Sequence, residues 1–172
     1  MQVVKNILLS LLVVWFAILL FMPKDKLFFA LEKNLETQGI LINEKAIETG
    51  MFSLNLLEAD IYVKGIKVAH VEKINIFTLL FITNINIKEV TIDASLKAFV
   101  PEKIDKMNIT HSIFSPMKAD ILANGSFGDM EGVVDLQERT LRLDFSNNTK
   151  EIDLLKANLN KDEKGLYYET SF

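Results

Sequence analysis

Apolar residues follow three different patterns along this chain of 172 residues. Residues 7–22 are an unbroken run without a charge. Residues 24–38 place their apolar side chains on one stripe at helical spacing, which predicts an amphipathic helix. From Gly39 onward the apolar positions alternate with period two, which is typical of strands with one buried face. The chain therefore predicts one apolar helix, one amphipathic helix and a mainly β domain.

Short turns separate the alternating segments, so consecutive strands are expected to pair antiparallel as a meander. The alternation changes face by one residue at Leu57, and again at Lys88 and Glu89. Such a slip is typical of a β-bulge, which bends a sheet. The predicted fold class is mainly β with minor α content: an N-terminal transmembrane helix, then a bent antiparallel β-sheet meander with a short helix packed on it. Three further segments are predicted to be a loop or single helical turn at 101–107, a short helix at 147–158 and a last strand at 165–172.

The uncharged run predicts that the chain is attached to a membrane. A helix of 16 residues spans about 24 Å, and Val3, Val4 and the flanking lysines extend it toward the ~30 Å hydrocarbon core. A cleaved signal peptide is one alternative, but residues 20–25 contain no small-x-small cleavage site. A buried core helix is the other. We expect an uncleaved anchor at 1–23 and one domain at 24–172.

Charge does not orient this anchor, because lysines flank the run on both sides. A very short N-terminal tail, one anchor and a long following domain form the usual signal-anchor layout, and long domains are translocated largely regardless of flanking charge. We therefore expect the domain outside the cytoplasmic membrane. The absence of cysteine agrees with this but is equally common in cytosolic domains.

Composition excludes nucleic acid as a partner. The net charge is −4, the only arginines are Arg139 and Arg142, and the only tryptophan is Trp15 within the uncharged run. A nucleic-acid surface needs a basic face with arginine and stacking aromatics, and none is visible.

The chain also lacks the residue patterns of catalysis and metal binding. His70 and His111 have no further ligands at metal-site spacing. Glu58 and Asp60 alternate as on a solvated strand face, and the glycine-rich stretch 124–132 matches hairpin geometry but no phosphate loop. We predict no enzyme activity, no catalytic residue, no cofactor and no metal.

The order of the segments carries a resemblance to a known group. After the anchor come LEKNL at 31–35, a long bent strand at 52–63, the segment 74–92, ANGSFGDMEGVVDL at 123–136 and LRLDF at 141–145. This order resembles the type II secretion protein N family and, more loosely, the AsmA-like periplasmic proteins of Gram-negative envelopes. The resemblance implies a single-pass protein of the cell inner membrane with a curved β-sheet in the periplasm. It also implies a link to secretion machinery or to lipid movement between membranes. The family has no catalytic residues that could be assigned to positions of this sequence.

Two hypotheses concern the apolar residues on the strand faces that are expected inside the bend. These residues either pack against the helix at 24–38 as ordinary core or line an apolar groove that shelters an acyl chain. The stripe of that helix rests on the domain or, alternatively, on the lipid interface. The candidate groove residues are Phe52, Leu54, Leu56, Ile74, Ile76, Ile85 and Ile87.

The expected function is a non-enzymatic, inner-membrane-anchored periplasmic component of an envelope or type II secretion-like assembly. The alternative is a lipid-binding or lipid-transfer protein. The expected partners are the membrane, proteins of an envelope or secretion complex, and phospholipid.

Overall fold

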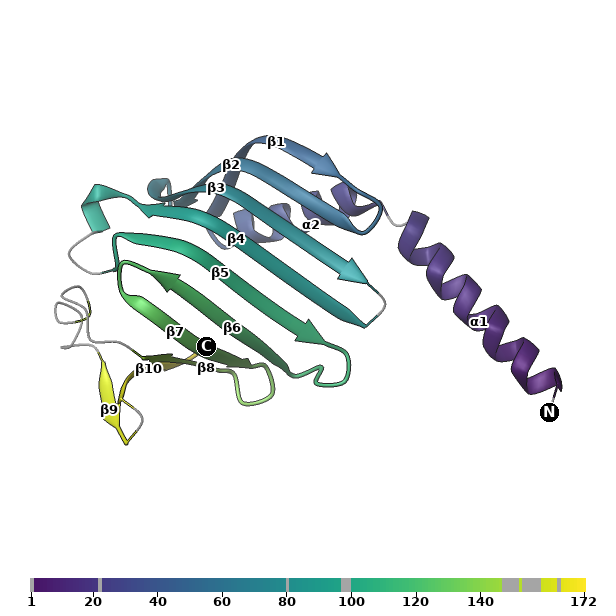
Figure 1. Cartoon of the computed structure of the whole chain (residues 1–172). Coiled ribbons are helices and arrows are strands. Elements are labelled where there is room, and N and C mark those ends of the chain that lie inside the picture. The colour runs from purple at the N-terminus through teal and green to yellow at the C-terminus, as the bar shows by residue number, and fades with distance from the viewer. Residues whose placement is uncertain are drawn as a thin grey trace.

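The fold is a single antiparallel sheet preceded by two helices (Figure 1). The computed structural model describes residues 2–21, 23–79, 81–96, 100–146, 152, 159–163 and 165–172. The helices are α1 (Gln2–Phe21) and α2 (Lys24–Thr37), so the predicted amphipathic helix at 24–38 is confirmed. The strands are β1 (Ile40–Thr49), β2 (Ser53–Val63), β3 (Ile66–Leu79), β4 (Ile82–Ile92), β5 (Lys103–Ser112), β6 (Lys118–Gly125), β7 (Gly128–Asp135), β8 (Thr140–Phe145), β9 (Asn160–Asp162) and β10 (Gly165–Ser171), with a 3₁₀ turn η1 (Ala94–Leu96) after β4.

The predicted antiparallel sheet is confirmed, and β1 to β8 pair in chain order. The order then changes, because β10 pairs with β8 and leaves the three-residue β9 at the edge. The prediction of a loop or helical turn at 101–107 is wrong, since β5 begins at Lys103. Its apolar residues Ile104 and Met107 are three positions apart, and this spacing hid the strand from a period-two pattern.

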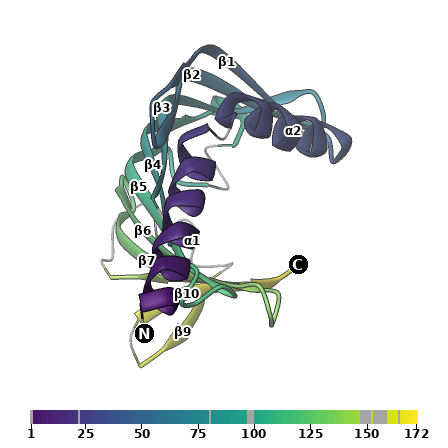
Figure 2. The same ribbon diagram turned by 90° about the vertical axis from the view of Figure 1, so that its right-hand side faces the viewer.

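The sheet is strongly curved and forms a trough (Figure 2). Helix α2 lies on the concave side, near β1 and β2, and α1 extends away from the sheet. The only ring contact of α1 given by the described residues is Phe16 against Phe52, with centroids 5.8 Å apart. Among the described residues, no helix is both sufficiently long and sufficiently apolar to cross a membrane.

The changes of face predicted from the alternation coincide with left-handed backbone at Glu58 (φ 47°) and Glu89 (φ 51°). The pairing register continues across Glu58, because Leu57 lies opposite Lys73 and Ala59 opposite Val71. The face therefore changes through the local backbone conformation and without an inserted residue. Register shifts occur elsewhere, between Ile61 and Tyr62 against β3 and between Ile104 and Lys106 against β6.

Three apolar clusters stabilise the trough. Phe28 of α2 packs on Leu54 and Leu56 of β2. The other two clusters are Ala59, Ala69, Val71 and Val90 in the first half of the sheet, and Ile121, Ala123, Phe127, Met130 and Ile152 in the second. The predicted helix at 147–158 lies outside the described residues except for Ile152, which is fully buried. The concave face is thus covered at both ends, by α2 and by Ile152.

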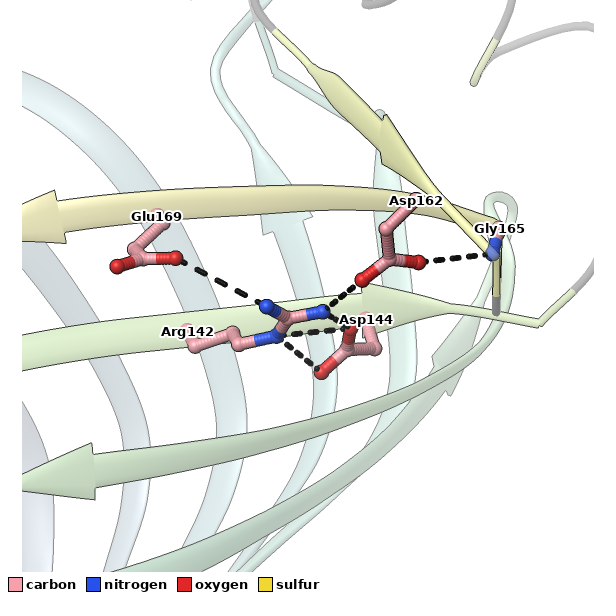
Figure 3. A network of polar contacts seen from close by, with 5 residues as sticks. All are labelled: Arg142, Asp144, Asp162, Gly165 and Glu169. Carbon is pink, nitrogen blue, oxygen red and sulfur yellow. Dashed lines mark hydrogen bonds and ion pairs between the residues drawn. The ribbon is translucent and has the colours of Figure 1, made fainter.

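A charged cluster joins the last strands (Figure 3). The Arg142 guanidinium on β8 donates to Asp144 on the same strand and to Asp162 on β9. It also stacks 4.1 Å from the ring centre of Tyr167 on β10. The two carboxylates raise the pKa of Arg142, so the cluster stays ionised. It holds the short edge strand against the sheet, because β9 has only three ladder pairs of its own.

Candidate functional site

The structure brings six of the seven predicted groove residues together in two neighbouring rows. These rows cross β2, β3 and β4: one is Leu54, Ile76 and Ile85, and the other is Leu56, Ile74 and Ile87. The seventh, Phe52, lies just before β2 beside Phe16 of α1. All three strands therefore contribute to one apolar surface.

Burial divides this surface into a packed part and an open part. Leu54 is 4% exposed and Leu56 is 1% exposed, and both lie under Phe28. The four isoleucines on β3 and β4 are only half-buried. The residues on β2 therefore pack as ordinary core, as the first hypothesis expects. The isoleucines on β3 and β4 remain partly accessible.

A pocket of ≈ 370 Å³ lies between α2 and this surface. Apolar side chains supply most of its wall, and one ammonium and two hydroxyl groups supply the rest. It is lined by Lys24, Leu27, Phe28 and Leu31 of α2 and by Phe52, Leu54, Ile76, Thr78 and Thr83. This volume lies within the ~300–1,000 Å³ of small-molecule sites.

The polar groups of the pocket are suited to an anionic or hydroxyl-bearing head group. The hydroxyls of Thr78 and Thr83 are 3.3 Å apart and half-buried. Lys24 stands in the first turn of α2, whose N-cap residue Pro23 offers no side-chain hydrogen bond. The first amides of a helix are donors without an intrahelical partner and favour negative charge. The pocket can therefore hold a molecule with an apolar tail and a polar head.

Asp60, His70 and Glu58 take part in ion pairs and hydrogen bonds with neighbouring side chains. His70 Nδ1 is 2.6 Å from Asp60 Oδ1, and Lys67 Nζ is 2.7 Å from the same oxygen. The hydrogen bonds from Lys67 and His70 hold the pKa of Asp60 below its ordinary value. Glu58 pairs separately with Lys45 at 3.0 Å. Within the described ranges, no three side chains of the metal-ligating types gather around one point.

Sequence reasoning missed part of the pocket wall. Leu27 and Leu31 belong to the predicted helical stripe, but nothing in the stripe showed that they line a pocket beside Phe28 and are not core. Thr78 continues the even-numbered alternation of Ile74 and Ile76, which is the signal that could have placed it. The contribution of Lys24 depends on where α2 docks and has no signal in the sequence.

Comparisons with known protein families, with curated proteins and with solved structures found no match. The resemblance to the type II secretion protein N family accordingly stays a prediction.

Proposed function

We propose that this protein binds lipid-like amphipathic molecules, with an acyl chain in the pocket between α2 and the concave face of the sheet. The observation that carries this proposal is the pocket itself, which combines an apolar wall with the ammonium of Lys24. Binding apolar surface in such a pocket gains free energy in proportion to the area removed from water. Holding such a molecule requires no catalytic step.

We also propose that α1 attaches the protein to a membrane. Large apolar side chains are exposed along the helix, and water-exposed apolar surface of this extent marks a membrane or protein contact. They are Val3, Val4, Ile7, Leu8, Leu9, Leu11, Leu12, Val13, Val14, Trp15, Phe16, Ile18 and Phe21. The uncharged run at 7–22 also includes Met22, which lies outside the described residues. On this proposal the domain at 24–172 is periplasmic, and one pocket residue, Lys24, lies shortly after the end of α1 at Phe21.

The test of lipid binding uses two matched variants of α2. Leu31 lines the pocket and Phe29 does not, although both side chains are about half exposed, at 52% and 49%. Native mass spectrometry of the detergent-purified full chain should show retained phospholipid or fatty acid. Leu31→Asp places a carboxylate in the apolar wall and should abolish retention, whereas Phe29→Asp should keep it. Equal retention in both variants, or no lipid on the parent protein, would contradict the proposal.

A second candidate function, a component of an envelope or type II secretion-like assembly, is favoured by the edge strand β1. Among the described strands it pairs with β2 alone, so the other side of its backbone is open to a strand of another protein. Glu44, Lys45 and Glu48 on this strand limit indiscriminate pairing. A photo-crosslinker at Ala46 should then give one discrete adduct in cells, and a cross-linker at Thr91 on β4 should not. Adducts of equal yield at both positions would argue against this role.

A further inference from the structure

Three lysines form one row across the middle of the sheet. Lys73 on β3 lies opposite Lys88 on β4, and Lys88 lies opposite Lys106 on β5. Directly opposed side chains on neighbouring strands have Cβ atoms about 4.5–5.5 Å apart, and like charges so placed are destabilising. The row continues into uncharged residues on both sides, Leu57 on β2 and Asn124 on β6, and Asn124 in turn lies opposite Asp129 on β7. The sheet therefore carries a concentrated positive charge at a cost to its own stability.

The neighbouring acidic groups are engaged with other lysines. Glu89 and Asp105 both pair with Lys103, at 2.6 and 2.9 Å. Glu58 pairs with Lys45. Within the part of the chain that the structure describes, none of the three row lysines has a carboxylate within ion-pair distance. Three further acids lie close to the row: Glu72 is exposed and next to Lys73 in the chain, and Asp129 and Glu131 line a second hollow beside Lys106. The positive charge is therefore most concentrated at Lys73 and Lys88.

The row faces a shallow hollow with stiff walls. A hollow of ≈ 390 Å³ is lined by the three lysines and by Asn75 and Asn86. The asparagines belong to the next row, where Asn86 donates to Asn84 at 2.7 Å and Asn108 donates to Asn86 at 2.9 Å. Because these amides bond to one another, they fix the shape of the hollow while the lysines supply its charge.

We propose that the Lys73–Lys88–Lys106 row binds a phosphate group that carries at least two negative charges. Lysine binds phosphate as a flexible point charge, and three ammonium groups from adjacent strands can converge on one such group. Binding would remove the repulsion that the empty row imposes on the sheet. The site is independent of the lipid pocket, since none of its five lining residues borders that pocket. The phosphate belongs either to a small soluble compound or to a lipid head group.

The test is a titration of the full chain in an uncharged detergent at low ionic strength, because salt screens exposed charges. Isothermal titration calorimetry with pyrophosphate should show one saturable site per chain. Vesicles that contain phosphatidic acid are the second probe: binding to them that pyrophosphate reverses assigns the site to lipid head groups, and its absence assigns the site to soluble phosphates. Lys88→Gln should weaken the binding of pyrophosphate at least tenfold.

The control is Lys33→Gln, which removes the same charge from an exposed position on α2 and should change the affinity less than twofold. Lys88→Gln should also raise the melting temperature in phosphate-free buffer and lose the stabilisation that pyrophosphate gives the parent protein. Lys106→Gln repeats the test if Lys88→Gln does not fold. The absence of a saturable site, or an equal loss of affinity in Lys33→Gln, would overturn the proposal.

Discussion

Side chains that share one face of the trough differ widely in what covers them. Leu56 is sealed between Phe28 and Ile74, whereas Ile85, two strands along in the next row, is half-buried and belongs to none of the three clusters. A carboxylate at a sealed position cannot reach water or a partner, but one at the open position can. The two positions therefore separate a structural role from a ligand-facing role.

Leu56→Asp is expected to abolish cooperative unfolding. Burying an unpaired carboxylate costs several kcal/mol, comparable to the whole stability of a domain of this size, about 5–15 kcal/mol. Ile85→Asp should still give a cooperative melt at a lower temperature. Thermal melting followed by circular dichroism measures both. A folded Leu56→Asp protein would show that Phe28 does not seal the β2 end of the rows.

At this scale the sequence predicted which residues share a face but not how each is covered. The even spacing of Ile74 and Ile76 was sufficient to place them beside Leu54 and Leu56, because strand alternation is local. The charged cluster around Arg142 could not be predicted in the same way. Its partner Asp162 is 20 residues away, and local periodicity does not predict contacts at that separation.

Helix α2 shows how an element can be correctly predicted and yet dock in an unexpected way. The apolar stripe predicted the helix at 24–38, but only one of its four residues, Leu27, Phe28, Leu31 and Leu35, is buried, namely Phe28. Leu27 and Leu31 line the pocket, and Leu35 is half-buried. Glu32, one helical turn after Phe28, lies near β1, where Glu44 Oε2 is buried without a hydrogen-bond partner among the described residues.

Glu32→Gln is expected to stabilise the protein at neutral pH. Partial burial, followed by repulsion from Glu44 and Glu36, raises the pKa of Glu32. A carboxyl group whose pKa is raised by folding favours the folded state when protonated, so its contribution is lost as pH rises from below 4.5 through the folded pKa. The gain at pH 7 should be at most about 1 kcal/mol, since solvent screens partly exposed charges.

Denaturant unfolding of Glu32→Gln at pH 4 and pH 7 tests this expectation. The difference from the parent protein should be small at pH 4 and larger at pH 7. Glu48→Gln, an exposed position on β1, is the matched control and should show little difference at either pH. Destabilisation of Glu32→Gln at pH 7 would mean that Glu32 has a favourable partner in the docked helix.

The trough as a whole is one open sheet, a meander from β1 to β8 with β1 at one edge and β9 at the other. The sequence predicted the antiparallel order, because the short turns are local features. It predicted the bend from β-bulges at Leu57 and at Lys88 and Glu89, where the pairing register continues without an inserted residue. The sequence did not reveal that β10 inserts between β8 and β9, since that arrangement depends on pairing across residues 146–159. Nor did it show that α2 and Ile152 cover opposite ends and leave the middle of the concave face half-open.

The attachment of α1 to a membrane is the prediction that concerns the whole molecule. Burying its exposed apolar side chains in lipid removes them from water, so the full chain should stay in the membrane pellet after a carbonate wash. The protein extracted from the membrane should have the mass of a chain that begins at Met1. Leu12→Lys combined with Phe16→Lys places two charges in the run and should release the protein, because a charge in the hydrocarbon core costs about 2.5–3.5 kcal/mol.

A periplasm-dependent reporter fused after Phe172 should be active. A chain that begins near Lys24, or a reporter that is active only in the cytoplasm, would remove the anchor or reverse the placement of the domain.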